Sequence, residues 1–336
     1  MNTLLRGKDL ITLADWSLQE IRTVIDIALE MKRLYALGRY EELLAHRTLF
    51  MLFFEQSTRT RNSLEAGMTQ LGGHAHDLTP DKMQITHGES PKDTAKVLSR
   101  MGDAIAIRNC FHGIGNDYLG RIAEHAEVPV ISMQDDLYHP LQALADLMTM
   151  EEYFGSHPRG LRVAVSWAYA TTHAKPLSVP ISQALLFPRF GMDLVIAHPP
   201  EFPLPETMIE RARAFAETGG GSVALTDSME EAVSGADVVI PKNWGGFAWF
   251  DRFKDDEEHA RVMKEHLERH RDWICTREVF AGARRGARIM HALPADRGNE
   301  ITDELLDSEA SIVYDEAENR LHTSKSVLAL LMGGRP

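Results

Sequence analysis

Short runs of consecutive apolar residues alternate along this chain with stretches in which apolar residues recur at the spacing of a helix. Residues 48–54 are an aromatic-rich apolar run typical of a buried strand, and residues 62–71 follow with apolar side chains at helical intervals. Further strands are expected at residues 75–78, 104–108 and 128–133, and further helices at residues 12–37, 91–101 and 140–154. This alternation predicts a mostly parallel α/β sheet.

A second series of the same kind follows residues 155–160, where Gly and Pro interrupt the helical pattern like a hinge. Its strands are expected at residues 161–166, 192–197, 236–240, 288–290 and 311–314, with helices ending near 190, at 255–271 and at 316–331. We therefore predict an α/β protein of two doubly wound parallel-sheet domains. The first comprises residues 1–154, completed by a final helix at 316–336, and the second comprises residues 155–315.

Composition narrows the class of protein. The chain has 336 residues, of which 44% are hydrophobic and 25% charged, as in soluble globular proteins. No apolar run approaches the roughly 20 residues of a membrane span, and residues 1–10 lack a signal-peptide core, so a cytoplasmic location is expected. The net charge of −13 argues against a nucleic-acid or membrane-surface partner. Two cysteines, Cys110 and Cys275, provide neither a disulfide framework nor a zinc site.

The segment between the first strand and its helix has the chemistry of an anion site. It reads Ser57-Thr58-Arg59-Thr60-Arg61, and Ser57 is a residue type that caps helices. The free N–H groups of a helix start, two hydroxyls and two guanidiniums all favour phosphate oxygens. The alternative is a capped helix with two surface arginines, in which Arg61 pairs with Glu65.

Three motifs together resemble the aspartate/ornithine carbamoyltransferase family over nearly the whole chain. They are Ser57-Thr58-Arg59-Thr60-Arg61, His139-Pro140-Leu141-Gln142 and His291-Ala292-Leu293-Pro294. The resemblance implies an enzyme that moves a carbamoyl group from carbamoyl phosphate to a small amino-acid-like amine. Such a reaction needs cations for the phosphate, donors for the oxygen that gains charge, and orientation of two substrates.

The resemblance also implies which residues bind carbamoyl phosphate. They are Ser57, Thr58, Arg59, Thr60, Arg108, His139, Gln142, the backbone around Leu293, and Arg320. Gln84 would reach the site from a neighbouring subunit, which implies a homotrimer or a multiple of trimers. Gly88 stands where ornithine-type members usually carry a lysine. No metal or organic cofactor is implied. Each residue also has a structural alternative, as a strand end, a helix cap or a surface side chain.

The acceptor side departs from the ordinary ornithine enzymes. Their Asn-Asn pair is absent from residues 167–180, Lys242-Asn243-Trp244-Gly245-Gly246 replaces their Ser-Met-Gly loop, and Ala292 replaces a cysteine. The first two departures resemble the knotted transcarbamylases, which include the N-acetylornithine and N-succinylornithine carbamoyltransferases and related members of unassigned substrate. This resemblance implies a trefoil knot in the second domain. The candidate acceptor residues are Lys242, Trp244, Asp135, Asp136, Lys175 and Ala292.

Several alternatives stay open at this point. Trp244 is equally explained by core packing, Asp135 and Asp136 by a solvated turn, and His291 by orienting its own loop. The protein as a whole is alternatively an ornithine carbamoyltransferase proper, or a catalytically silent trimer that binds carbamoyl phosphate. Ornithine, N-acylated ornithine, putrescine and other amines all remain possible acceptors. A nicotinamide-dependent dehydrogenase or a P-loop kinase is excluded, because neither glycine-rich fingerprint is present.

Overall fold

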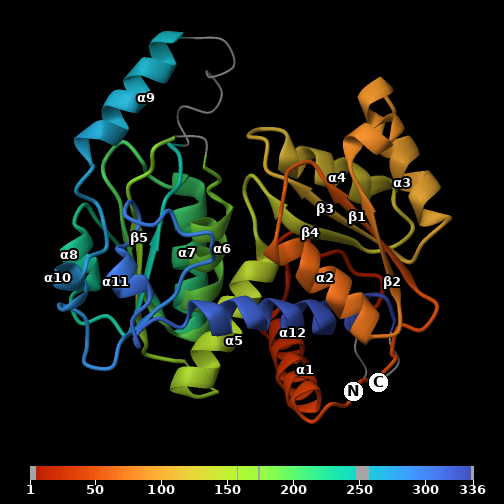
Figure 1. Cartoon of the computed structure of the whole chain (residues 1–336), viewed down its shortest axis with the longest axis horizontal. Helices are drawn as coiled ribbons and strands as arrows, with labels where there is room; N and C mark the ends of the chain where they lie inside the picture. The colour runs from red at the N-terminus through yellow and green to blue at the C-terminus, as the bar shows by residue number, and fades with distance from the viewer. Residues whose placement is uncertain (1–4, 157, 173–174, 247–256, 334–336) are drawn as a thin grey trace. The chain divides into compact units, whose positions relative to one another are not determined.

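The chain forms two compact α/β units in the computed structural model, which describes residues 5–156, 158–172, 175–246 and 257–333 (Figure 1). Unit 1 comprises Met1–Met148 and Glu318–Pro336, and unit 2 comprises Thr149–Ala317. Both boundaries fall inside helices, α5 (Pro140–Phe154) and α12 (Val313–Leu331). The division therefore does not follow the Gly/Pro segment at residues 155–160.

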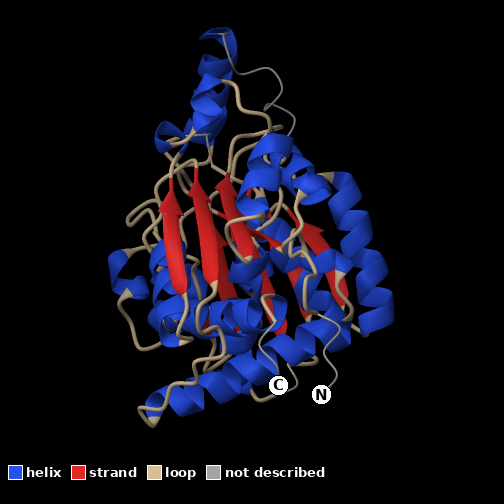
Figure 2. Ribbon diagram, turned by 90° about the vertical axis from the view of Figure 1, so that its right-hand side faces the viewer, coloured by secondary structure: helices blue, strands red, loops and turns tan. Residues whose placement is uncertain are grey.

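Unit 1 is built on a four-stranded parallel sheet. Its strands are β1 (Thr48–Phe53), β2 (His74–Leu78), β3 (Ala104–Asn109) and β4 (Val130–Asp135), in the order β2-β1-β3-β4. Figure 2 shows neighbouring strands running in the same direction. In the register, Phe53 pairs with Arg108 and Asn109 with Asp135, so the polar strand ends meet at one edge of the sheet.

The helices of unit 1 are α1 (Leu18–Ala36), α2 (Arg59–Gln70), α3 (Pro91–Ser99), α4 (Gly115–His125) and the unit 1 parts of α5 and α12. Short 3-10 turns lie at Leu13–Asp15, Pro80–Lys82 and Gln84–His87. α1 begins with a full capping box, in which Ser17 and Glu20 each accept the other's backbone N–H. Ile105, Ile107, Leu119 and Ile122 pack between the sheet and α4.

Unit 2 is built on a five-stranded parallel sheet in the order β7-β6-β5-β8-β9. The strands are β5 (Arg162–Trp167), β6 (Asp193–Ala197), β7 (Ser222–Thr226), β8 (Val238–Lys242) and β9 (Arg288–Ile289). The helical segments are α6 (Ser178–Leu186), η4 (Phe187–Phe190), α7 (Glu206–Gly219), α8 (Met229–Val233), α9 (Glu257–Arg269), α10 (Arg277–Phe280) and α11 (Asp303–Leu306). Ala164, Val195, Val239 and Ile289 form part of its buried core.

One expected strand is wrong. The apolar residues at 311–314 make only a single parallel bridge, between Ser311 and Ile289, and the chain then enters α12 at Val313. A short run of this kind fits a strand and the first turn of a buried helix equally well. The segments α4, α7, β7 and α8 were not expected from the sequence pattern.

The knot stays a prediction, because residues 173 and 174 of the relevant loop lie outside the described residues. Beside that gap, the backbone N–H of Gly245 donates to the carbonyl of Lys175 at 3.0 Å. Within the part of the chain that the structure describes, no helix is both long and apolar enough to cross a membrane. The same residues contain no group of three or more His, Cys, Asp or Glu arranged to hold a metal ion.

Candidate active site

Three arginines act electrostatically on a buried histidine in unit 1. Arg59 lies in the first turn of α2, Arg108 near the end of β3, and Arg320 in α12. His139 immediately precedes α5 and is 4% exposed. Burial, together with the positive charges of Arg320, Arg108 and Arg59, holds the pKa of His139 well below its usual value. The imidazole is therefore neutral at neutral pH, within a concentration of positive charge that favours an anion.

Arg320 is fixed in this cluster by two side chains from other parts of unit 1. Its guanidinium is 2% exposed, and it donates from Nη1 to Gln142 Oε1 at 2.6 Å and from Nη2 to Thr60 Oγ1 at 2.9 Å. Gln142 in turn donates from Nε2 to Asp146 Oδ1 at 2.7 Å. A buried charge needs such partners. The structure thus brings together Thr60, Gln142 and Arg320, which are widely separated in the sequence.

The segment before α2 differs from the expected capped helix. α2 begins at Arg59, Thr58 occupies the N-cap position, and no side chain caps the helix, so the expectation that Ser57 is the cap is wrong. Neither the Ser57 nor the Thr58 hydroxyl is hydrogen-bonded within the described residues. The first N–H groups of a helix have no acceptor inside it. Hydroxyls and backbone donors are consequently available together at this helix start.

Arg61 does not pair with Glu65 as the alternative reading expected. It forms an ion pair with Asp77 of β2, and its guanidinium lies 4.0 Å from the centre of the Phe53 ring. These contacts hold Arg61 against the sheet. Arg59 is therefore the better candidate ligand of the two.

Arg108 is anchored at the carboxyl edge of the unit 1 sheet. Its Nε lies 4.0 Å from Glu55 Oε2, and Glu55 Oε1 accepts the backbone N–H of Cys110 at 2.9 Å. Burial raises the pKa of Glu55 above its usual value, against the opposing effects of that hydrogen bond and of Arg108. The pair holds the guanidinium beside the start of α2.

Asp135 and Asp136 serve the folding of unit 1. Asp135 is fully buried and accepts the hydroxyl of Ser132 and the backbone N–H groups of Leu137 and Tyr138. Asp136 accepts the N–H groups of Gly113 and Asn116 and so caps the start of α4. Their geometry favours structural roles, although in a buried rather than a solvated turn. The tertiary cap also explains why α4 has no local sequence signal.

Gln84 lies at the surface of unit 1, as a contact to another subunit requires. It begins the short 3-10 turn Gln84–His87 and is exposed, and its Oε1 lies 3.2 Å from His87 Nδ1. Its predicted role in a neighbouring site stays a prediction.

A second polar cluster lies at the carboxyl edge of the unit 2 sheet. Lys242, the last residue of β8, donates to Asn243 Oδ1 at 2.6 Å and to Glu300 Oε1 at 3.0 Å. The Lys242 side chain is 14% exposed and that of Glu300 is 0% exposed. His291 Nε2 lies 3.2 Å from the other Glu300 oxygen. Glu300 was not predicted from the sequence, because a single carboxylate in a polar stretch carries no spacing signal.

The remaining acceptor candidates surround this cluster or lie in the core. Trp244 is 1% exposed, and its Nε1 donates to the carbonyl of Phe202 at 2.9 Å, which favours the core-packing alternative. Ala292 is buried, and Lys175 is half-buried. Leu293 has a positive φ of 46°, and its N–H donates to His291 Nδ1 at 2.9 Å. His291 therefore orients its own loop.

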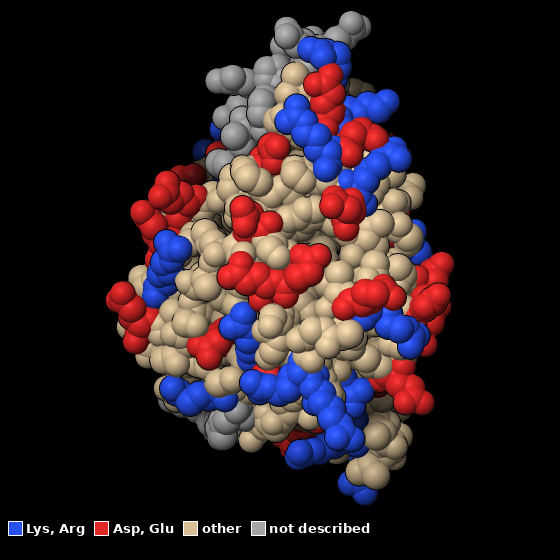
Figure 3. Space-filling view, turned by 90° about the vertical axis from the view of Figure 1, so that its left-hand side faces the viewer, with Lys and Arg blue, Asp and Glu red and all other residues tan. Residues whose placement is uncertain are grey.

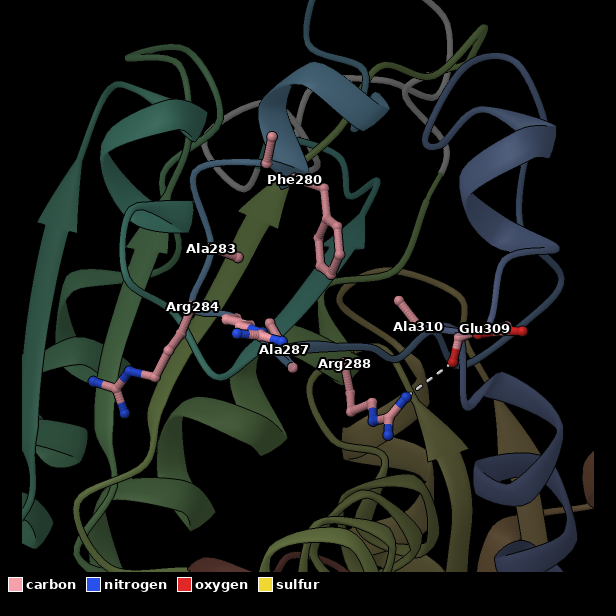
Figure 4. A pocket seen from close by; sticks show the side chains of 10 residues that line it. Phe280, Ala283, Arg284, Ala287, Arg288, Glu309 and Ala310 are labelled. Carbon is pink, nitrogen blue, oxygen red and sulfur yellow. Dashed lines mark hydrogen bonds between the residues drawn. The ribbon is translucent and has the colours of Figure 1, made fainter.

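A surface pocket in unit 2 is a separate feature. It has a volume of about 330 Å³ and is lined by residues 280, 281, 283–288, 309 and 310 (Figure 4). Arg284 pairs with Asp237 at 2.7 Å and Arg288 donates to the carbonyl of Glu309 at 2.9 Å. It lies at the amino end of β9, away from the strand ends that bear the candidate residues. Figure 3 shows acidic and basic side chains in separate patches on one face.

Comparisons with known proteins agree with this architecture. Residues 8–152 match the family model "Aspartate/ornithine carbamoyltransferase, carbamoyl-P binding domain", and residues 176–331 match "Aspartate/ornithine carbamoyltransferase, Asp/Orn binding domain". The ornithine carbamoyltransferase of Methanospirillum hungatei is 39% identical, over 97% of this chain and 99% of that protein. That of Pyrococcus abyssi is 38% identical, over 98% of this chain and 97% of that protein.

Solved structures give the same result. Ornithine carbamoyltransferase from Pyrococcus furiosus has a TM-score of 0.87 and 36% identity, and the match covers 99% of both chains. N-acetyl-L-ornithine transcarbamylase has a TM-score of 0.87 and 30% identity, and covers 96% of this chain and 99% of its own. The two family models together span most of the sequence. The chain belongs to the aspartate/ornithine carbamoyltransferase family.

Proposed function

We propose that this chain transfers the carbamoyl group of carbamoyl phosphate to an amine of a small amino-acid-like acceptor and releases phosphate. The observation that carries the proposal is the buried contact of Arg320 with Thr60 and Gln142, in a cluster where Arg59 and Arg108 also act on neutral His139. Family membership and relatives named ornithine carbamoyltransferase support it.

The donor side follows from the charge and hydrogen-bonding capacity of these groups. Arg59, the free N–H groups of α2 and the hydroxyls of Ser57 and Thr58 would hold the dianionic phosphate. Neutral His139, with Arg108, would donate to the carbonyl oxygen as it gains negative charge. The amide of the carbamoyl group would donate to Gln142 Oε1.

The reaction balances without a cofactor. The amine nitrogen bonds to the carbonyl carbon, the bond from that carbon to the phosphate oxygen breaks, and the amine loses a proton as phosphate leaves. The protein supplies cations, hydrogen-bond donors and orientation.

On the acceptor side, Lys242 is the best-supported ligand for a carboxylate. An ammonium group has three N–H donors, and two of those of Lys242 are used by Asn243 and Glu300. The third remains for an acceptor. The relatives include ornithine carbamoyltransferases and an N-acetyl-L-ornithine transcarbamylase, so we propose ornithine or an N-acylated ornithine as the acceptor. We further propose a cytoplasmic homotrimer in which Gln84 reaches a neighbouring site.

The test is phosphate release from carbamoyl phosphate across a panel of amines. The panel holds ornithine, N-acetylornithine, N-succinylornithine, aspartate, lysine, diaminopropionate and putrescine. We expect release with one ornithine-type amine well above the others. Putrescine lacks a carboxylate, so preference for it would remove Lys242 from acceptor recognition. No release with any amine, alongside tight carbamoyl phosphate binding, would favour the silent binder instead.

The donor site is tested separately by Arg59→Ala. The variant should fold and lose measurable carbamoyl phosphate binding in calorimetry, because it removes a cation from the start of α2. Arg61→Ala is the matched control, since Arg61 pairs with Asp77, and it should keep most of the affinity. Unchanged affinity in Arg59→Ala would overturn the donor-site assignment.

A further inference from the structure

Glu300 lies at the centre of a buried polar network at the carboxyl edge of the unit 2 sheet. Its Oε1 accepts from Lys242 Nζ at 3.0 Å and from the Asn243 backbone N–H at 2.6 Å. Its Oε2 accepts the Asp296 backbone N–H at 2.6 Å and faces His291 Nε2 at 3.2 Å. A fully buried carboxylate is stable only when its oxygens are bound in this way. One side chain thus joins the end of β8 to the segment that contains residues 291–296.

The network keeps Glu300 ionised. Burial alone would raise the pKa of its carboxyl, but the charge of Lys242, the His291 ring that faces it and the hydrogen bond from the Asp296 N–H hold that pKa well below its usual range. The negative charge opposite Lys242 therefore persists throughout the neutral pH range.

The proton on His291 is also fixed by its contacts. Nδ1 accepts the Leu293 N–H at 2.9 Å, so Nδ1 carries no proton. In the neutral ring the proton is then on Nε2, which faces Glu300. The His291 backbone N–H donates to Glu316 at 2.7 Å. These contacts hold the loop in which Leu293 adopts a positive φ, a conformation that such a side chain rarely takes without support.

We propose that Glu300 is a positioning residue that sets the ammonium group of Lys242 and the loop at residues 291–294 for binding of the acceptor. The inference rests on the proposed function, because it assigns Lys242 to the acceptor carboxylate. Glu300 itself is fully buried and touches no substrate in this account. It accepts one N–H of the Lys242 ammonium while Asn243 Oδ1 accepts a second, and together these two contacts set the direction of the third N–H.

The test compares Glu300→Gln with wild type. Glutamine keeps the shape of the glutamate side chain but carries no charge, so Lys242 loses its counter-charge. Its NH2 group would also face one of the N–H groups that Glu300 now accepts, so the loop at residues 291–294 loses a contact. We expect the acceptor KM to rise by about tenfold or more, as for loss of a charge-assisted hydrogen bond, and the carbamoyl phosphate Kd of the free enzyme to rise much less. Glu309→Gln, an exposed carboxylate in the same unit, should change neither.

A double-mutant cycle with Lys242→Met separates positioning from general destabilisation. If Glu300 acts through Lys242, Glu300→Gln should raise the acceptor KM much less in the Lys242→Met background than in wild type. Fully additive effects would overturn the proposal. Should Glu300→Gln fail to fold, Glu300→Asp retains the charge on a shorter side chain and should show the same split between the acceptor KM and the carbamoyl phosphate Kd.

A spectroscopic readout does not depend on turnover. Long-range 1H–15N spectra should show His291 with its proton on Nε2 in wild type, and a changed ring signal in Glu300→Gln. A proton on Nδ1 in wild type, or an unchanged ring signal in the variant, would overturn the proposal. Wild type that releases no phosphate with any amine would instead refute the proposed function, and the His291 signals would still decide whether Glu300 holds the loop.

Discussion

Arg320 shows how a single side chain organises unit 1. It is buried, yet its charge is retained because Gln142 and Thr60 accept both ends of its guanidinium. Lysine would bring the same charge without the planar fork. The residue therefore fixes the geometry of the cluster as well as contributing to its charge.

Arg320→Lys should weaken carbamoyl phosphate binding while leaving the protein folded. We expect the Kd to rise by about 10-fold to 100-fold, because an ammonium group lacks the rigid planar fork whose two nitrogens reach Gln142 and Thr60 in fixed directions. Calorimetry measures the affinity. Arg284→Lys, at an exposed position paired with Asp237, serves as the control and should not change it. An Arg320→Lys affinity equal to wild type would mean that the fork is not required.

Asp135→Asn should stabilise the protein at alkaline pH. Burial raises the pKa of Asp135 to about 7, so the folded state binds a proton that the unfolded state releases near pH 4. Wild type then loses stability as the pH rises from about 4 to about 7. Asparagine can still accept from Leu137 and Tyr138 and donate to Ser132, without a charge to bury.

Chemical denaturation at two pH values tests this expectation. The variant's free energy of unfolding should exceed that of wild type by about 4 kcal/mol at pH 8 and should nearly match it around pH 4. Asp227→Asn, at an exposed position, should show no such difference. A variant that is less stable at both pH values would show that the hydrogen bonds of the carboxylate outweigh its charge.

Single residues also show what sequence can and cannot predict. The motifs indicated Thr60, Gln142 and Arg320, and these side chains do meet in the structure. The burial of Asp135 was not predictable, because its turn is polar in sequence and is enclosed only by the fold. Glu300 was missed for the same reason, since its partners come from β8 and from the segment around residues 291–296.

The helices and strands follow their local signals where those signals are strong. α1 begins at a capping box, α5 begins at Pro140, and β1 is an aromatic-rich apolar run. α4 lacks such a signal, because its first N–H groups are capped by Asp136 from a distant part of the chain. Residues 311–314 carried an ambiguous signal, and the last two of them form the start of the long helix α12.

Ser17→Ala should destabilise unit 1 through α1 alone. It removes the side-chain acceptor for the Glu20 N–H, and we expect a loss of about 1 kcal/mol in the free energy of unfolding. Denaturant titration measures the change. Gln19→Ala, on an exposed side chain in the same turn, should have a much smaller effect. Equal losses in the two variants would show that the capping box contributes little.

At the scale of the whole molecule, unit 1 is discontinuous in sequence. Its first part ends at Met148 and its second part begins at Glu318, so all of unit 2 is inserted between them. Val327 and Leu328 of the returning helix are fully buried. The order of motifs in the sequence indicated this return, but the exact boundaries inside α5 and α12 depend on packing that no local pattern carries.

The proposed shared site predicts complementation between two inactive variants. Arg59→Ala lacks a cation in its own site, and Gln84→Ala lacks the residue proposed to reach the neighbouring site. In a cyclic trimer assembled from an equal mixture, about a quarter of the sites would contain both wild-type residues. Phosphate release should therefore recover to about a quarter of the wild-type rate after unfolding and refolding the mixture together.

As a control, each variant is refolded separately and the two are then mixed. This mixture should release little phosphate, because each trimer contains only one variant unless subunits exchange. A mixture that stays inactive after joint refolding, with both variants folded, would contradict a site shared between subunits. Light scattering of wild type would report the assembly independently.

The return of the chain to unit 1 has a consequence for synthesis on the ribosome. Domains usually fold in order from the N-terminus as the chain emerges. Here Arg320 lies near the C-terminus, so the nascent chain carries Thr60 and Gln142 long before their partner is translated. A polypeptide that terminates early would therefore lack the guanidinium at the centre of the cluster. The proposed anion site can therefore form only after α12 has been translated.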